Sequence, residues 1–351
     1  MKKKHHKKIL ILDGISGVSL AKDISESIIS AGIHCDYIDC AQLKKKKFYK
    51  PRQAINKIIQ KSLFSQEFYY TPKIPSQIFA QAIEASQANI VFVVGFLYRF
   101  IDIEYIIHLK EKQGFSLYLY DTDSCNLFSR RRELLYFINQ EFPIYDRVFS
   151  FSSVMANFSN KLNKTEAYYF PFGSKDIPPP TNKQKEHDVF FIGSADLRRI
   201  FLLEKLTKHN TVIYGSRWGK NWSVISSQLQ KKIIEQNLWG KELHQHLHQS
   251  KIILNITRSG FYGVETGLNL RIFETLAAGA FLLTDYCDEL ADLFTIGQHI
   301  EAFKSSEEMV DKVDYYIKNS DKREKIARNG LQLFHEKFSW DKRVAELLPL
   351  L

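Results

Sequence analysis

Two stretches in the second half of the sequence carry residue types suited to binding a diphosphate. The first ends an apolar run with Gly193-Ser194 and continues to Arg198 and Arg199. A strand that ends there and leads into a helix would present backbone N–H groups and the positive end of the helix dipole to an anion. Two guanidinium groups suit phosphate oxygens. A helix cap followed by surface arginines is the alternative, and this stretch alone leaves both interpretations open.

The second stretch runs from Thr266 and Gly267 through Asn269 to Arg271 and Glu274. A loop that becomes a helix at this point supplies further N–H groups for phosphate, and Arg271 on the first turn adds positive charge. Glu274 lies on an otherwise apolar helix face, where a carboxylate needs a partner. A ribose diol is one such partner. An ion pair between Glu274 and Arg271, at i and i+3, is the other.

Asp121 and Asp123 follow a predicted strand and form a D-x-D tripeptide. Such a tripeptide could ligate a metal ion that holds a diphosphate. One of the carboxylates could instead take a proton from a hydroxyl group or orient it. A strand-end cap, or an ion pair with the arginines at 130–132, is the structural alternative. We expect no metal site in the chain.

Aromatic side chains offer a further place for a nucleobase. Tyr214 and Gly215 follow another predicted strand and could form the floor of a base pocket. Trp218, Trp222 and Trp239 either pack in the second domain or provide a ring that stacks on the base. The histidines at 244, 246 and 248 alternate, so a helix spreads them over different faces and a zinc site is not expected.

These residues require a frame of alternating strands and helices, which both halves of the sequence predict. In the first half, apolar runs at 8–12, 35–38, 89–95, 116–120, 147–151 and 166–170 alternate with helical patterns. In the second half, the runs at 188–192, 211–214, 251–256 and 280–284 do the same. Continuous apolar strands between amphipathic helices are typical of parallel sheets buried on both faces.

A proline-rich segment separates the two halves. We therefore predict an N-terminal Rossmann-like domain over 1–172, a linker over 173–186 and a C-terminal Rossmann-like domain over 187–330. The last residues, 331–351, are expected to form a helix that crosses back to the first domain. The fold class is α/β, with two doubly wound units facing across a cleft.

Composition and charge limit the classes of function. The chain of 351 residues is 44% hydrophobic and 25% charged, which excludes a mostly disordered or fibrous protein. Its net charge of +10 is concentrated in residues 1–186, where 27 Lys and Arg face 18 Asp and Glu. A solvated basic face explains this excess, and so does an anionic partner such as a lipid head group or a phosphorylated glycan. No nucleic-acid-binding motif is present, so we expect no nucleic acid partner.

Four cysteines without metal-site spacing and no apolar run of membrane-spanning length favour a cytoplasmic protein. A position at the inner membrane surface is compatible with this expectation, because the basic N-terminal half could contact the membrane peripherally.

The pattern N-x-R-x-F-E-x-L-A-x-G-A-F-L-L-T-D, from Asn269 to Asp285, resembles the C-terminal domain of glycosyltransferase group 1 families, and within them the CgeB-like branch. DVFFIGSADLRR, WGKELHQHLHQSKIILNITRSG, YDRVFSFS and YYFPFG add to the resemblance, which covers most of residues 115–345. The resemblance implies a GT-B fold, a nucleotide-sugar donor held mainly by the second domain and an acceptor held by the first. It also implies that chemistry needs no bound metal.

The resemblance assigns roles to single residues. Glu274 matches the second glutamate of an E-x7-E motif, which holds the nucleotide ribose. The first glutamate would stand at Thr266, so its neighbour Glu265 is the candidate at the donor sugar. Arg258 and Arg198 are the candidates that stabilise the departing diphosphate. Asp121, Asp123, Arg258 and Glu265 form the predicted catalytic set.

The expected activity is transfer of a sugar from a nucleotide-diphosphate donor to a hydroxyl acceptor, in surface glycan or glycoconjugate synthesis. The acceptor could be anionic or lipid-linked. A non-catalytic nucleotide- or glycan-binding protein and a protein-modifying glycosyltransferase are the alternatives.

Overall fold

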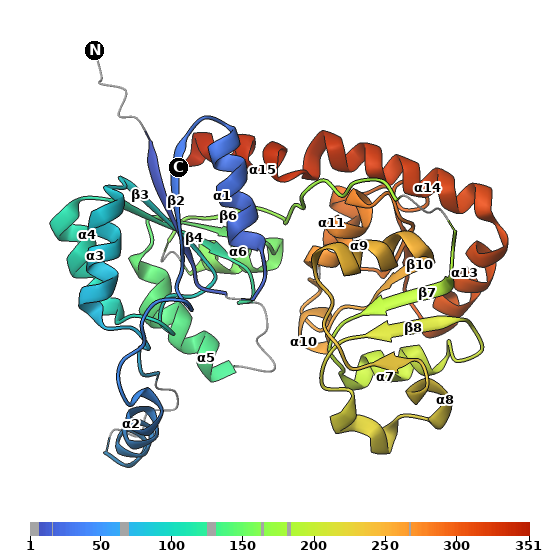
Figure 1. The fold of residues 1–351 in the computed structure, drawn as a ribbon, viewed down its shortest axis with the longest axis horizontal. Helices are drawn as coiled ribbons and strands as arrows, with labels where there is room; N and C mark the ends of the chain where they lie inside the picture. Colours follow the sequence, from blue (N-terminus) through green and yellow to red (C-terminus); the bar gives the residue numbers. More distant parts are fainter. Residues whose placement is uncertain are drawn as a thin grey trace. The chain divides into compact units, whose positions relative to one another are not determined.

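The computed structural model describes residues 7–15, 17–63, 70–124, 131–162, 165–180, 184–266 and 268–351. The chain forms two compact units, one of residues 1–171 with 344–351 and one of residues 172–343. Each unit contains a parallel six-stranded sheet (Figure 1). One of the four cysteines, Cys125, lies outside the described residues, and so do Arg130 and Gly267.

The sheet of the first unit has the strand order β2-β1-β3-β4-β5-β6. Its strands are β1 (Lys8–Asp13), β2 (His34–Asp39), β3 (Ile90–Val94), β4 (Ser116–Asp121), β5 (Arg147–Ser150) and β6 (Ala167–Tyr169). The apolar runs of β1 and β3 are buried along nearly their whole length, as expected for central parallel strands. Figure 1 shows α1 on the opposite side of this sheet from α3 and α4.

The helices of the first unit are α1 (Leu20–Ser30), α2 (Tyr49–Leu63), α3 (Ser76–Ser86), α4 (Ile103–Gln113), α5 (Arg131–Tyr136) and α6 (Ser153–Lys161). A π-helical turn (Phe137–Glu141) and a 3-10 turn (Phe142–Ile144) continue α5. Asp102 and Ser152 cap α4 and α6 with their side chains, which accept N–H groups of the first turn.

The sheet of the second unit has the order β12-β11-β10-β7-β8-β9. Its strands are β7 (His187–Ile192), β8 (Thr211–Tyr214), β9 (Ile233–Ile234), β10 (Ser250–Asn255), β11 (Leu282–Asp285) and β12 (Glu301–Phe303). The central pair β7 and β10 is buried, and residues such as Phe191, Leu254 and Trp218 form the core. Because all neighbouring strands are parallel, their carboxyl ends share one edge of the sheet.

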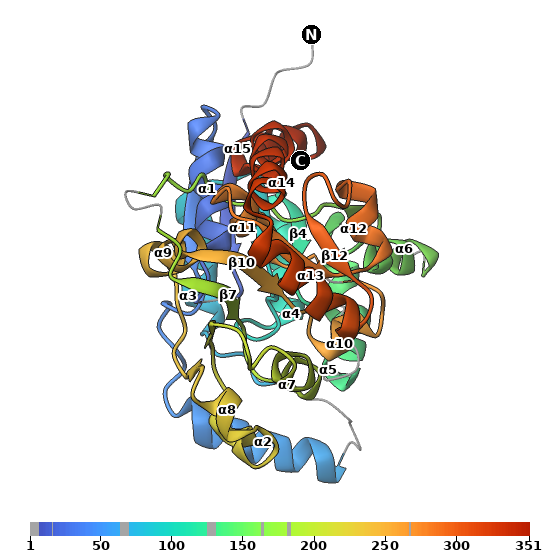
Figure 2. The same ribbon diagram turned by 90° about the vertical axis from the view of Figure 1, so that its right-hand side faces the viewer.

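The helices of the second unit surround this sheet in the view of Figure 2. They are α7 (Leu197–Glu204), α8 (Ser227–Gln230), α9 (Gly240–Gln249), α10 (Ser259–Tyr262), α11 (Leu270–Ala277), α12 (Asp288–Leu293), α13 (Ser306–Lys318) and α14 (Ser320–Leu333). The last helix, α15 (Trp340–Leu347), begins in the second unit and ends in the first.

The expectation of an α/β fold with two doubly wound sheets is confirmed. The second unit begins at Phe172 and extends to Arg343. Its two ends are joined because the backbone of Ser174 pairs with that of Ser339. The N–H of Ser174 donates to Phe338 O at 3.1 Å, and that of Trp340 donates to Ser174 O at 2.9 Å. Val344–Leu351 belongs to the first unit, where Arg147 donates to the carbonyl of Leu350. Among the described residues, no helix has the length and apolar character needed to cross a membrane.

Candidate functional site

Three arginine side chains gather where β7 and β10 end in the second unit. Arg258 Nη2 donates to Ser194 Oγ at 3.2 Å, and Arg198 Nη1 donates to the carbonyl of Thr257 at 3.0 Å. The third, Arg199, donates to the carbonyls of Ser194 and Ile256, and two carboxylates, Asp196 and Asp285, lie among the arginines. Three positive charges against two negative ones leave an excess of one, which favours an anionic ligand.

Asp285, the last residue of β11, fixes the position of Arg198. Its buried carboxylate accepts the Thr257 N–H at 2.9 Å and Arg198 Nη1 at 2.6 Å. The Arg198 guanidinium also lies 3.7 Å from the centre of the Tyr262 ring. A cation held on one side by a buried carboxylate and on another by an aromatic face is fixed before a ligand arrives, as electrostatic stabilisation of a developing charge requires.

Arg199 has a structural role rather than the predicted role of a phosphate-binding fork. It is 6% exposed, and its Nε and Nη2 donate to Ile256 O while Nη1 donates to Ser194 O. Burial lowers the pKa of Arg199 to about 10. The side chain therefore joins the ends of β7 and β10 and thereby positions Ser194.

Gly193 and Gly215 allow the loops after β7 and β8 to touch. Gly215 has φ +145°, and a Cβ there would lie 2.0 Å from Gly193 O. The Gly193 N–H already donates to Tyr214 O at 2.9 Å, and Gly193 O accepts the indole N–H of Trp218 at 3.1 Å. Protein groups therefore engage both the N–H and the carbonyl of Gly193, and the predicted role of this glycine in donor binding stays a prediction.

The Tyr214 ring packs at a tilt against a histidine ring, and its place under a nucleobase stays a prediction. Its ring centre is 4.8 Å from that of His246, which is in turn nearly parallel to Phe190 at 5.3 Å. Trp218 is fully buried, which supports the packing interpretation for this tryptophan, whereas Trp222 and Trp239 are exposed.

The start of α11 lies at the same edge of the sheet as the arginines. Asn269 caps the helix by accepting the Arg271 N–H at 3.0 Å, and its Nδ2 donates to Asn255 Oδ1 at 3.0 Å. Asn255, the last residue of β10, donates in turn to Thr284 Oγ1 in β11 at 2.9 Å. This chain of amide and hydroxyl groups ties the first turn of α11 to the ends of two strands.

Arg271 and Glu274 form the ion pair that the i, i+3 spacing offered as an alternative. Arg271 Nη1 lies 2.9 Å from Glu274 Oε2, with side chains 13% and 21% exposed. Burial lowers the pKa of Arg271, and Glu274 opposes that effect. Within the described residues, the buried Nε of Arg271 has no hydrogen-bond acceptor, and Nη1 has only its ion pair with Glu274. A buried guanidinium with unused donors next to a carboxylate has the chemistry to accept a polar ligand.

Thr266 and Glu265 occupy different environments. Thr266 is buried and donates to Glu289 Oε2 at 2.6 Å, so its hydroxyl anchors the loop before α11. Glu265 is exposed and has φ +56°, a left-handed conformation that is strained for a glutamate. Its contact with a donor sugar stays a prediction.

In the first unit, Asp121 is the strand-end cap that was one of the three alternatives. The side chain is fully buried, and it accepts hydrogen bonds from the Ser124 hydroxyl, from Ser150 Oγ at 3.0 Å and from the Ser124 N–H at 3.0 Å. Burial raises the pKa of Asp121, and these hydrogen bonds oppose that effect. A buried carboxylate with these partners shapes the loop and cannot contact a substrate, which corrects its place in the catalytic set.

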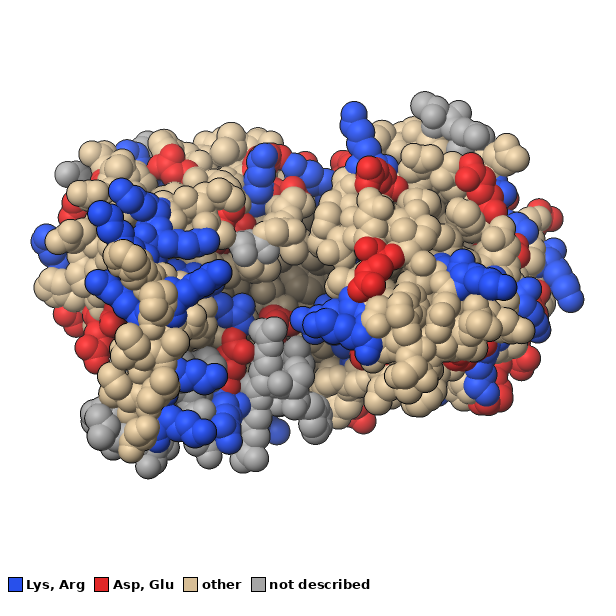
Figure 3. All heavy atoms as spheres, turned by 60° about the horizontal axis from the view of Figure 1, so that its bottom comes forward, with Lys and Arg blue, Asp and Glu red and all other residues tan. Residues whose placement is uncertain are grey.

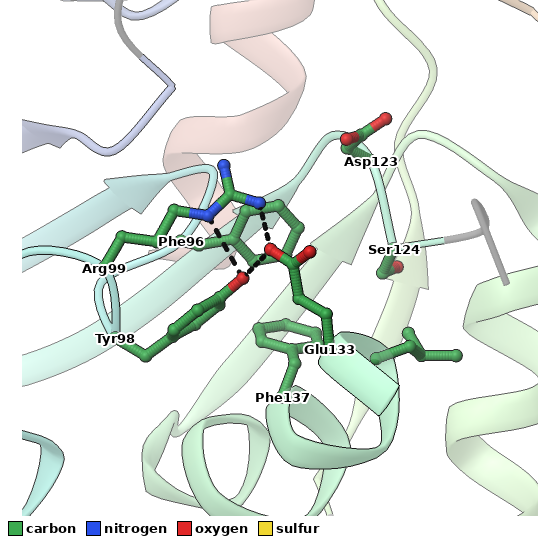
Figure 4. A pocket seen from close by; sticks show the side chains of 8 residues that line it. Phe96, Tyr98, Arg99, Asp123, Ser124, Glu133 and Phe137 are labelled. Carbon is green, nitrogen blue, oxygen red and sulfur yellow. Dashed lines mark hydrogen bonds and ion pairs between the residues drawn. The ribbon is translucent and has the colours of Figure 1, made fainter. Parts of the chain in front are cut away.

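Asp123, in contrast, lines a small pocket together with aromatic and charged side chains (Figure 4). Glu133 accepts hydrogen bonds from Arg99 and from the Tyr98 hydroxyl, and the Arg99 guanidinium lies 4.8 Å from the Phe96 ring centre. The sequence analysis assigned no role to these residues. The run Phe96–Phe100, which mixes aromatic residues with an arginine directly after a strand, was the one pattern that could have indicated a pocket here.

A buried carboxylate at the end of the π-helical turn after α5 fixes the backbone of two of the residues that follow β3. Glu141 accepts the N–H groups of Leu97 and Tyr98, both at 2.8 Å, and the Tyr145 hydroxyl at 2.6 Å. Burial raises the pKa of Glu141 to about 7. No cluster of three metal-ligating side chains occurs in the part of the chain that the structure describes.

Comparison with known proteins adds to this geometry. Residues 198–349 match the family described as "Glycosyl transferase-like". The matched residues lie mostly in the second unit and include Arg198, Arg258, Arg271 and Glu274. No curated protein matches the sequence.

Solved structures share the fold over nearly the whole chain. Sucrose-phosphate synthase from Thermosynechococcus elongatus has a TM-score of 0.69 at 10% identity, covering 98% of both chains. Anabaena HepE in complex with UDP-glucose has a TM-score of 0.65 at 12% identity, covering 99% of this chain and 100% of that one. A glycosyltransferase from Rickettsia africae has a TM-score of 0.60 at 12% identity, covering 99% and 98%.

The family match over residues 198–349 and these structures confirm two expectations: the GT-B fold, and the class of glycosyltransferase. Membership of the CgeB-like branch stays a prediction.

Proposed function

We propose that this glycosyltransferase binds a nucleotide-diphosphate sugar at the carboxyl ends of β7, β10 and β11 and transfers the sugar to a hydroxyl acceptor. The observation that carries the proposal is the fixed pair of guanidinium groups, Arg198 on Asp285 and Arg258 on Ser194, within the family-matched domain. A structure of Anabaena HepE, which has the same fold, contains UDP-glucose, and this complex supports a donor of that class.

In the proposed reaction the acceptor oxygen attacks the anomeric carbon, and the bond from that carbon to the diphosphate oxygen breaks. Negative charge develops on the diphosphate, where Arg198 and Arg258 stabilise it. Such stabilisation acts in the transition state and raises the rate rather than the affinity alone.

The ribose is proposed to lie at Glu274. Its carboxylate would accept hydrogen bonds from the ribose hydroxyls, and the neighbouring Arg271 would donate to acceptors of the same nucleotide. A bound nucleotide would then supply an acceptor for the buried Arg271 Nε, which has none among the described residues. Glu265 is the proposed contact to the donor sugar.

The acceptor proton needs a base, and Asp123 is the candidate in the first unit. It lies at the pocket edge, whereas Asp121 is fully buried. The paired charged groups of Arg99 and Glu133 line the same pocket and would offer polar contacts to a hydroxyl acceptor. A carboxylate that takes the hydroxyl proton as the new bond forms completes the proton balance.

An anionic or lipid-linked acceptor, in surface glycan or glycoconjugate synthesis at the inner membrane surface, is part of the proposal. It is supported by the excess of basic residues in the first half of the chain.

The test is a panel of UDP-, GDP-, CMP- and dTDP-sugars, with binding measured by calorimetry and hydrolysis followed by nucleotide release. We expect one nucleotide class to bind, and Glu274→Gln to weaken its binding about tenfold. Glu336→Gln, on the exposed turn after α14, is the control that should change nothing. Failure of every nucleotide sugar to bind would refute the proposal, and binding without transfer or hydrolysis would favour a non-catalytic binding protein.

A further inference from the structure

Helix α2 of the first unit (Tyr49–Leu63) exposes apolar side chains that a surface helix ordinarily buries. Its apolar side chains are exposed: Ile55 is 58%, Ile58 65% and Ile59 40% accessible. These residues, at i, i+3 and i+4, share one face of the helix. Phe48, immediately before the helix, is 77% exposed and extends that apolar surface.

The face of α2 that lies against the rest of the unit is polar. Its partly buried side chains are spaced by four, three and four residues, and they are Tyr49, Gln53, Asn56 and Gln60. Asn56 Nδ2 lies 3.5 Å from Thr71 Oγ1. Figures 1 and 2 both show α2 projecting from the body of the unit. A helix normally buries its apolar stripe and exposes its polar one, so this reversal indicates that the isoleucines have a partner outside the unit.

Charge specifies the kind of partner. Residues 44–61 contain eight Lys and Arg and no Asp or Glu. Lys50, Lys57 and Lys61 form a row along one side of the isoleucine face, and Arg52 lies on the other side. Basic side chains gather on the first unit in the view of Figure 3, on the left. A narrow apolar face bordered by basic residues fits the interface of an anionic bilayer, where apolar side chains enter the acyl boundary and lysines meet head groups.

We propose that α2, with Phe48 and Lys44–Lys47, docks the enzyme on an anionic lipid surface. The proposal deepens the membrane location given above and stands apart from the proposed catalysis. A second copy of the chain is a poorer occupant, because two such faces would bring sixteen like charges together, twice the eight on each chain. Nucleic acid is also a poorer occupant, since it would contact the lysines and leave the isoleucines exposed.

The test is co-sedimentation of the full chain with phosphatidylcholine vesicles, with or without phosphatidylglycerol. We expect binding to the anionic vesicles and little to the neutral ones. The triple variant I55S/I58S/I59S and the triple variant K50Q/K57Q/K61Q should each weaken binding at least about tenfold, with the loss for the lysine variant shrinking as salt rises.

Matched controls come from the same unit. The variant I29S/I107S/V154S removes exposed apolar side chains elsewhere, and K22Q/K112Q/K161Q removes exposed lysines elsewhere. Both should bind vesicles like the wild type. No binding to anionic vesicles, equal losses in the α2 and control variants, or a change of oligomeric state in the isoleucine variant would overturn the proposal. Nucleotide-sugar binding, measured on the same samples, should be unchanged in all variants, so failure here is separable from failure of the proposed function.

Discussion

Arg258 is the most exposed of the three clustered arginines, and its guanidinium donates to Ser194 through one nitrogen. Replacing it with alanine therefore removes a cation without leaving a buried carboxylate unpaired. We expect Arg258→Ala to lower kcat for sugar transfer or donor hydrolysis about a hundredfold, equivalent to about 3 kcal/mol of transition-state stabilisation. Thermal stability should be nearly unchanged. Arg328→Ala, on exposed α14, is the matched control, and equal kcat in both variants would place the leaving-group site elsewhere.

The two aspartates of the D-x-D tripeptide are expected to differ sharply. Asp121→Asn removes a buried charge that accepts hydrogen bonds from Ser124 and Ser150, so it should lower the free energy of unfolding by about 1–3 kcal/mol. Asp123→Asn should leave stability intact and lower kcat on the order of a hundredfold, with donor binding unchanged. Urea titration and steady-state kinetics separate these effects. A stable, inactive Asp121→Asn protein would contradict the assignment.

The sequence predicted correctly which two stretches contribute arginines to the cluster. It predicted less well which of those arginines is free to bind a ligand. The sequence placed Arg198 and Arg199 together as a fork, but consecutive helical residues point in different directions, and only Arg199 points into the backbone of two strand ends. The pairing of Glu274 with Arg271 was one of the two alternatives that the sequence left open, and it rested on their i, i+3 spacing. Asp285 was missed as a site residue, although its position at the end of an apolar strand was the signal.

At the scale of the elements, the contact of Gly193 with Gly215 sets the spacing between the loops after β7 and β8. A methyl group at residue 215 would meet Gly193 O, a backbone atom that cannot move aside cheaply. We expect Gly215→Ala to lower the free energy of unfolding by about 2–4 kcal/mol, because the cost of the strained φ adds to the cost of the clash. The same substitution should weaken donor binding.

Gly297→Ala is the control for that substitution, since it also has a positive φ but no atom within reach of the new methyl group. It should cost only about 1 kcal/mol. Chemical denaturation of the two variants measures the difference, and equal losses would mean that the loop contact contributes nothing beyond backbone strain.

Apolar runs predicted the sheet strands well because buried parallel strands are continuous in hydrophobicity. The prediction failed for α2, a segment for which the sequence predicted no element. Its isoleucines and lysines have helical spacing, but the flanking lysines made the segment look like a solvated run, and the face that lies against the unit is polar. Only the structure shows which face is exposed.

For the whole molecule, histidines make stability depend on pH. Among the described residues, burial lowers the pKa of five histidines, which all lie in the second unit: His209, His244, His246, His248 and His299. As pH falls below their unfolded value of about 6.5, the unfolded chain binds more protons than the folded one, so these groups reduce stability.

We therefore expect the melting temperature of the second unit to fall between about pH 7 and pH 5. The double variant His246→Gln with His248→Gln should show a shallower decrease than the wild type. Differential scanning calorimetry over a pH series makes the measurement. A melting temperature that rises on acidification, or one that falls equally in the variant, would show that other groups control the response.

The location of the donor is the claim on which the other functional assignments rest. A crystal structure of the full chain with the nucleotide diphosphate selected by the binding panel tests it most directly. We predict phosphate oxygens within hydrogen-bond distance of the Arg198 and Arg258 guanidiniums and the ribose hydroxyls on the Glu274 carboxylate. A nucleotide bound away from the ends of β7, β10 and β11, with these three side chains placed as in the unliganded chain, would contradict the account.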